Sequence, residues 1–155
     1  MPLSCIAMDA YIVIGNPNTR KSSVVRSLTG CFNRSIRDIL LVGDKTALRL
    51  YARVGCVQDT RTTPEEFIAE VSKARCAAVL CSLAPSAHPN YRSLYPDAQA
   101  YLARFKTEGW RVRSIAVLGQ NAGGVRAPNL RQFPQATTAP INVTAQAVRV
   151  HFGWV

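Results

Sequence analysis

Three residues near the N-terminus have the types and the spacing of a phosphate-binding loop: Gly15, Lys21 and Ser22. They follow a buried-strand pattern at residues 10–14 (AYIVI) and lead into a segment with helical periodicity. In this setting backbone N–H groups at a helix N-terminus converge on phosphate oxygens, a lysine reaches the β- and γ-phosphates, and the next hydroxyl holds Mg²⁺. The pattern therefore predicts a site for a phosphorylated ligand within residues 15–23.

The segment GNPNTRKSS at residues 15–23, followed by VVRSLTG, resembles the Walker A loop and first helix of the P-loop GTPases, several of which read G-N-P-N-x-G-K-[ST]. The resemblance implies phosphate and metal roles for Gly15, Lys21 and Ser22, and it places Asn18 near the γ-phosphate. The phosphate-binding set that it implies is Gly15, Asn18, Thr19, Arg20, Lys21, Ser22 and Ser23. It also implies Mg²⁺ with ATP or GTP as the cofactor of any bound nucleotide.

The chain departs from that family at three places. Arg20 stands where the family has the glycine whose N–H faces the β-phosphate, and we expect it to crowd the loop. Asp59 keeps the aspartate of the family's D-x-x-G motif without its glycine, so it is the candidate partner of Ser22 for Mg²⁺. Residues 119–124 (GQNAGG) replace the guanine-reading N-K-x-D motif. We therefore expect a degenerate P-loop NTPase-like protein with weak or lost nucleotide binding, a regulatory or accessory role and no assigned catalytic residue.

The charge balance supports a second hypothesis. The chain has 19 Lys and Arg against 9 Asp and Glu, a net charge of +10, which favours polyanionic partners. Arg49 and Arg53, with Arg37 across a predicted hairpin and Tyr51 interleaved, form a stripe suited to nucleic acid. The alternative function is thus a basic module that binds nucleic acid or an acidic protein, although a solvated edge hairpin has the same composition. An active small NTPase is a third hypothesis.

Other reactive side chains give weaker signals. His88, in a loop at residues 84–95, has the chemistry of an acid or base, but a solvated turn is the simpler interpretation. The loop at residues 119–131 is either a lid for a phosphate or a mobile linker. The five cysteines lack the spacing of a metal site, so we expect reduced thiols packed as small apolar side chains rather than zinc ligands or a nucleophile.

The elements that would position these residues alternate between strand and helix. Strands are predicted at residues 10–14, 36–42, 47–54, 76–83 and 112–118, and helices at 22–29, 64–75, 97–108 and 143–152. Gly43-Asp44 between the second and third strands predicts an antiparallel hairpin. This order predicts a three-layer α/β fold, P-loop NTPase-like, with a mainly parallel sheet of about five strands. Ligands bind beyond the carboxyl ends of such strands, where the loops 15–22, 55–63, 84–95 and 119–131 lie.

The length of 155 residues fits a single domain spanning residues 1–155. No apolar run approaches the ~20 residues of a membrane span, and no basic residue precedes the apolar N-terminal stretch. We therefore expect a cytoplasmic protein without membrane contact, and the sequence leaves its oligomeric state open.

Overall fold

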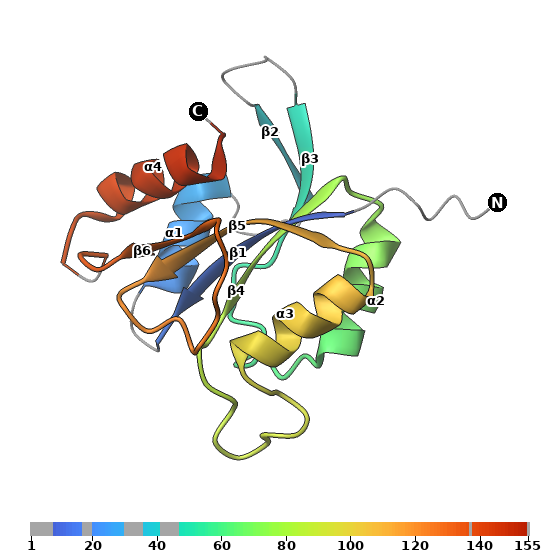
Figure 1. Cartoon of the computed structure of the whole chain (residues 1–155). Coiled ribbons are helices and arrows are strands. Elements are labelled where there is room, and N and C mark those ends of the chain that lie inside the picture. Colours follow the sequence, from blue (N-terminus) through green and yellow to red (C-terminus); the bar gives the residue numbers. More distant parts are fainter. Residues whose placement is uncertain (1–7, 17–19, 30–35, 41–46, 137, 155) are drawn as a thin grey trace.

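The structure, a computed structural model, describes residues 8–16, 20–29, 36–40, 47–136 and 138–154. Within these ranges the chain forms six strands and four helices (Figure 1). The strands are β1 (Asp9–Gly15), β2 (Ile36–Leu40), β3 (Ala47–Ala52), β4 (Ala78–Leu83), β5 (Arg111–Leu118) and β6 (Leu130–Phe133). The helices are α1 (Lys21–Thr29), α2 (Pro64–Ala74), α3 (Ala98–Thr107) and α4 (Ile141–Phe152).

One sheet with the order β2-β3-β4-β1-β5-β6 forms the centre of the fold. Strands β3, β4, β1, β5 and β6 run parallel to one another, and β2 runs antiparallel to β3, the pairing predicted for these two segments. The predicted hairpin turn, residues 41–46, lies outside the described residues. The observed fold is the predicted α/β class, and β1 occupies a central position between β4 and β5.

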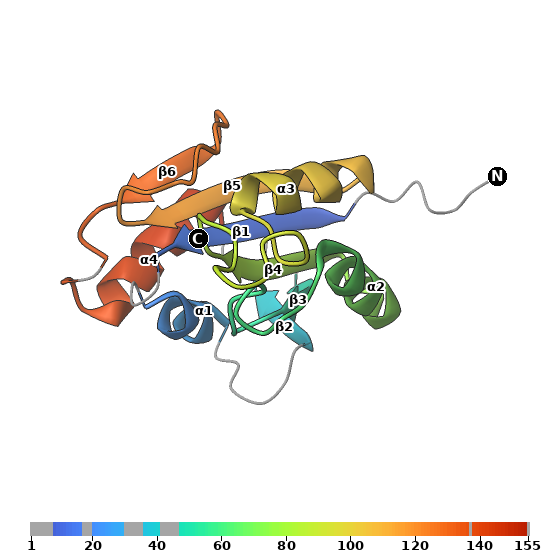
Figure 2. The same cartoon turned by 90° about the horizontal axis from the view of Figure 1, so that it is seen from below.

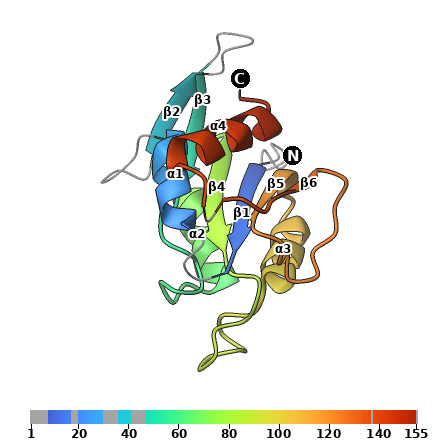
Figure 3. The same ribbon diagram turned by 90° about the vertical axis from the view of Figure 1, so that its left-hand side faces the viewer.

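Helices cover both faces of the sheet, and β1 is therefore buried on both sides. Ile12 and Ile14 pack in the cluster that includes α2 and α3, whereas Tyr11 and Val13 pack in the cluster that includes α1 and α4. Such two-sided burial is typical of a parallel strand with helical layers above and below it. The two helix pairs lie on opposite sides of the sheet in Figures 1 and 3.

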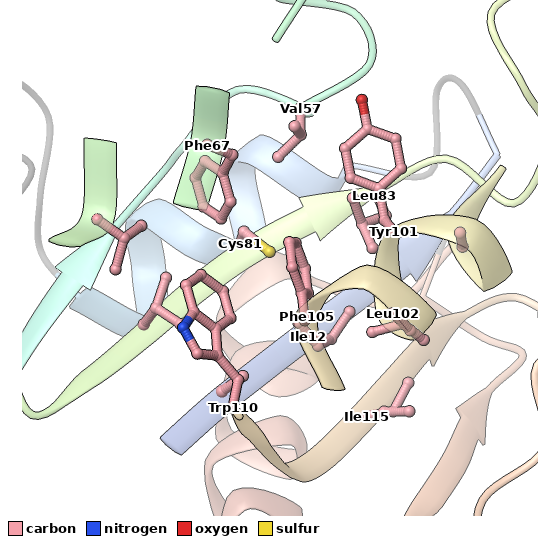
Figure 4. Packing of buried hydrophobic residues seen from close by; sticks show 14 of the residues in the cluster. Ile12, Val57, Phe67, Cys81, Leu83, Tyr101, Leu102, Phe105, Trp110 and Ile115 are labelled. Atoms are coloured by element: carbon pink, nitrogen blue, oxygen red, sulfur yellow. The ribbon is translucent and has the colours of Figure 1, made fainter. Parts of the chain in front are cut away.

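Aromatic residues fill the core beneath α2 and α3 (Figure 4). The rings of Phe105 and Trp110 pack with centroids 4.6 Å apart, and Phe67 lies 5.9 Å from Phe105. Tyr101 is fully buried, and its hydroxyl donates to the carbonyl oxygen of Thr62 at 2.5 Å. This hydrogen bond fastens the segment between β3 and α2 to the rigid core of the domain.

Local capping signals confirm two of the predicted helix starts. Thr63 accepts from the backbone N–H of Glu66, and the Glu66 carboxylate accepts from the backbone N–H of Thr63, which completes a capping box for α2. The Asp97 carboxylate accepts from the N–H of Ala100 and caps α3. In the described part of the chain, no helix has the length and apolarity needed to cross a lipid bilayer.

One predicted element was wrong. No strand is predicted between the strand at residues 112–118 and the helix at residues 143–152, but this region contains β6, which pairs in parallel with β5 and adds a strand beyond the predicted five. This strand has four residues, of which Arg131 and Gln132 are exposed, so it carries little of the apolar alternation that marks a strand. Pairing with β5, rather than a local propensity, determines its conformation.

Candidate functional site

The loops after β1, β3 and β4 meet at the carboxyl edge of the sheet. The loops after β3 and β4 lie side by side (Figure 2), and the side chain of Gln58 bonds to both backbone groups of Ala84. In the loop after β1 the structure describes Gly15, Asn16 and Arg20. Asn18 and Thr19, two of the predicted phosphate-binding residues, lie outside the described residues.

Lys21 is the first residue of α1 and is only 7% exposed. Its ammonium group donates to the carbonyl oxygens of Gly15 at 2.6 Å and Asn16 at 2.9 Å, which returns the side chain to the end of β1. Burial lowers the pKa of Lys21, while the charges of Cys56 and Asp59 act in the opposite direction. The lysine predicted to bind phosphate is thus held at the start of the helix in a partly desolvated position.

At the N-terminus of α1, backbone donors have no acceptor among the described residues. The first hydrogen bond of the helix runs from the N–H of Val24 to the carbonyl oxygen of Arg20 at 2.9 Å, so the N–H groups of Lys21, Ser22 and Ser23 have no partner within the helix. The first turn of α1 contains no acidic residue. The partial positive charge of the helix end and the positive charge of Lys21 therefore both belong to the first turn of α1.

Arg20 has a left-handed backbone, with φ of 67°. Glycine adopts this conformation without strain, whereas the Cβ of an arginine costs about 1–2 kcal/mol there. The guanidinium points to another part of the chain and donates to the carbonyl oxygen of Ala139 at 2.9 Å. The substitution that separates this loop from the GTPase pattern is thus accommodated by a strained backbone, and α1 still begins at the next residue.

A cavity of about 410 Å³ lies at this helix end. It is lined by Arg20, Lys21, Ser22, Ser23, Gly55, Cys56, Asp59 and Thr60. The structure therefore brings Asp59, predicted as the partner of Ser22 for Mg²⁺, into the same cavity as the start of α1. The Ser22 hydroxyl donates to the carbonyl oxygen of Val54 at 3.1 Å, which leaves the lone pairs of its oxygen available.

The segment between β3 and α2 is fixed by polar side chains that sequence reasoning missed. Gln58 is fully buried; its Oε1 accepts from the N–H of Ala84, and its Nε2 donates to the carbonyl oxygens of Ala84 and Pro96. Thr60 bonds to the carbonyl oxygens of Cys56 and Val57. A lone glutamine in a loop gives no sequence signal for such a role, because its partners lie 26 and 38 residues away.

The predicted nucleic-acid stripe does not form one open face. Arg53 makes an ion pair with Glu70 on α2 at 2.7 Å and hydrogen bonds to Thr62, and Tyr51 is buried with its hydroxyl bonded to Glu70. Arg49 is exposed. The side chain of Arg37 lies outside the described part of the structure. On β3, helix α2 therefore covers the face on which stacking was predicted.

The histidine, the segment after β5 and the cysteines, which gave weaker sequence signals, lie at separate positions in the fold. His88 lies in the loop after β4, against the rings of Tyr91 and Tyr95. Asn121, in the segment that replaces the guanine-reading motif, donates to the side-chain oxygen of Asn16 at 3.0 Å and so contacts the loop after β1.

Within the described ranges, no three His, Cys, Asp or Glu side chains group as a metal site. Cys56, Cys76 and Cys81 are buried, and none of these three described cysteines forms a disulfide.

Comparisons of this chain with protein-family models, with curated proteins and with solved structures find no match. The P-loop resemblance stays a prediction that rests on the residues of β1, the following loop and α1.

Proposed function

We propose that this chain binds the phosphate groups of a nucleotide, or of another phosphorylated small molecule, at the N-terminus of α1. The observation that carries the proposal is the juxtaposition of Lys21, the free N–H groups of Lys21, Ser22 and Ser23, and a cavity of about 410 Å³. A helix end with free amides and a cation favours a multiply charged anion. Binding here is weak, because the anion must displace the Gly15 and Asn16 carbonyl oxygens from the ammonium of Lys21.

Mg²⁺ fits the residues of this cavity. The Ser22 hydroxyl oxygen and the Asp59 carboxylate are hard oxygen ligands on the walls of one cavity, and Mg²⁺ is commonly bound by one or two protein oxygens together with substrate phosphates. When bound with a nucleotide, the ion would neutralise phosphate charge. The proposal assigns the site a binding role in a regulatory or accessory protein.

Thermal unfolding with a ligand panel tests this proposal. Pyrophosphate, ATP and GTP are added at 10 mM, each with and without Mg²⁺, to the wild-type chain. A dissociation constant of about 1 mM would stabilise the protein by about 1.4 kcal/mol, a rise in Tm of roughly 3–6 °C. Lys21→Ala abolishes the rise, whereas the control Lys106→Ala, which removes an exposed lysine of α3, retains it. Equal rises in wild type and Lys21→Ala would contradict the proposal.

A further inference from the structure

A second cavity, of about 320 Å³, adjoins the phosphate site at the same edge of the sheet. It is lined by Asn16, Gln58, Asp59, Ala84, Pro85, Ser86, Ala87, His88, Pro89 and Arg92. Asp59 lines both cavities, so this residue lies where they adjoin. The volume is at the lower end of the range of small-molecule sites.

Two exposed side chains of opposite charge, Asp59 and Arg92, line this cavity. None of the described residues forms an ion pair or hydrogen bond with the Asp59 carboxylate or the Arg92 guanidinium, and the two do not pair with each other. By contrast, Arg53, Arg104 and Arg111 each bond to a carboxylate. The second cavity thus presents Arg92 as an anion-binding group and Asp59 as a group that can bind a cation or a hydroxyl, and both are accessible to a ligand.

His88 adds a donor to the lining of the second cavity. Its Nδ1 accepts from the backbone N–H of Asn90 at 3.2 Å, so the neutral ring carries its proton on Nε2. The N–H of His88 donates to the carbonyl oxygen of Tyr95 at 2.9 Å, and the two rings pack with centroids 5.9 Å apart. The loop after β4, which extends beyond the sheet edge in Figures 1 and 3, therefore has a fixed conformation around this histidine.

The opposite end of this loop is fixed by close contact with the segment after β5. Gly123 has φ of 65°, and a Cβ on it would lie 2.4 Å from the carbonyl oxygen of Pro85. The Gln58 side chain holds Ala84 from the other side through both of its backbone groups. Apolar atoms of Pro85, Ala87 and Pro89 then complete a wall that is preformed rather than assembled by a ligand.

We propose that this cavity binds a small molecule with a carboxylate or phosphate at one end and a hydroxyl or ammonium group at the other. The anionic end pairs with Arg92 and the Nε2–H of His88, since a guanidinium and an imidazole donor suit an oxyanion. The other end donates to Asp59. A carboxylate has two oxygens, so Asp59 can bind this ligand and an ion or ligand in the phosphate cavity at the same time. This inference goes beyond the proposed function, because neither Arg92 nor His88 belongs to the phosphate cavity.

Titration of the ¹⁵N-labelled full chain with four probes tests the inference. L-serine and D-glycerate carry both required ends, glycerol lacks the anion, and ethanolamine lacks the carboxylate. Serine or glycerate is expected to shift the amides of Ser86, Ala87 and His88, while glycerol and ethanolamine bind at least tenfold more weakly. Asp59→Asn distinguishes an ammonium from a hydroxyl as the group that donates to residue 59. Loss of the negative charge weakens the binding of a ligand ammonium more than the binding of a ligand hydroxyl.

Variants locate the binding and separate the two proposals. Arg92→Gln is expected to weaken serine or glycerate binding roughly tenfold, the loss of one charge-assisted contact. The control Arg126→Gln, at an exposed arginine of another loop, leaves binding unchanged. Failure of serine and glycerate to shift these amides overturns the inference, as does binding that is insensitive to Arg92→Gln. A pyrophosphate response at Lys21 in the same sample would then show that the phosphate-site proposal stands independently.

Discussion

The guanidinium of Arg20 donates to the carbonyl oxygen of Ala139 at 2.9 Å, which joins the loop before α1 to the segment before α4 across 119 residues of sequence. The same residue has a left-handed backbone. Arg20 therefore contributes a favourable long-range contact and an unfavourable local conformation, and these two effects can be measured separately.

Arg20→Gly and Arg20→Ala both remove the contact with Ala139, but only glycine relieves the backbone strain. We expect Arg20→Gly to be the more stable of the two by about 1 kcal/mol in urea unfolding, since a Cβ is disfavoured at φ of 67°. The matched pair Arg26→Gly and Arg26→Ala, inside α1, should show the reverse order, because alanine is the better helix former by about 1 kcal/mol. The same order at both positions would contradict a left-handed Arg20.

Loss of the Arg53 side chain should destabilise the fold rather than remove a free binding group. Arg53→Ala leaves Glu70 without its ion-pair partner and removes bonds to Thr60 and Thr62, so we expect the free energy of unfolding to fall by about 1–3 kcal/mol. Arg49→Ala, at an exposed position of β3, should change it by less than about 0.5 kcal/mol. Two equal, small effects would show that the Arg53–Glu70 pair contributes little.

The buried amide of Gln58 should be sensitive to loss of its polar groups. Gln58→Met keeps the approximate shape but leaves the backbone N–H and carbonyl of Ala84 without their partners, at about 1–3 kcal/mol for each unsatisfied group. We expect a lower urea midpoint and faster hydrogen exchange at the Ala84 amide. An unchanged exchange rate at this amide would contradict the described bond.

The buried position of Lys21 predicts a pH-dependent difference in stability between the wild type and Lys21→Met. Because burial lowers the pKa of Lys21 in the folded protein, the unfolded chain binds more protons at alkaline pH. The stability of the wild type relative to Lys21→Met should therefore rise with pH, from the folded pKa up to the ordinary lysine value of 10.5. Urea unfolding at several pH values measures this, and parallel curves for the two proteins would refute it.

The sequence alone predicts the parts of this fold that depend on local signals. The apolar run of β1 and the capping box of Thr63 and Glu66 each involve residues a few positions apart, so their patterns are readable before the fold is known. The pairing of β2 with β3 likewise follows from two β-rich runs close in the chain.

Features that depend on distant partners could not be predicted in this way. Strand β6 is set by β5, and the Arg53–Glu70 pair forms only when α2 packs on β3. The left-handed backbone of Arg20 contradicts the preference of its own side chain, so no propensity indicates it. The convergence of Asp59 with Lys21 followed from the rule that loops meet at the carboxyl edge of a parallel sheet, but the second cavity beside them did not.

The most direct test of the phosphate site is a titration of the ¹⁵N-labelled protein with inorganic pyrophosphate, followed through the amides of α1. The N–H groups of Lys21, Ser22 and Ser23 are expected to show the largest, saturable shifts, because they are the donors that would meet the anion. These shifts should disappear in Lys21→Met while the rest of the spectrum is preserved. Largest shifts at other amides, or equal shifts at these three in Lys21→Met, would contradict a phosphate site at the start of α1.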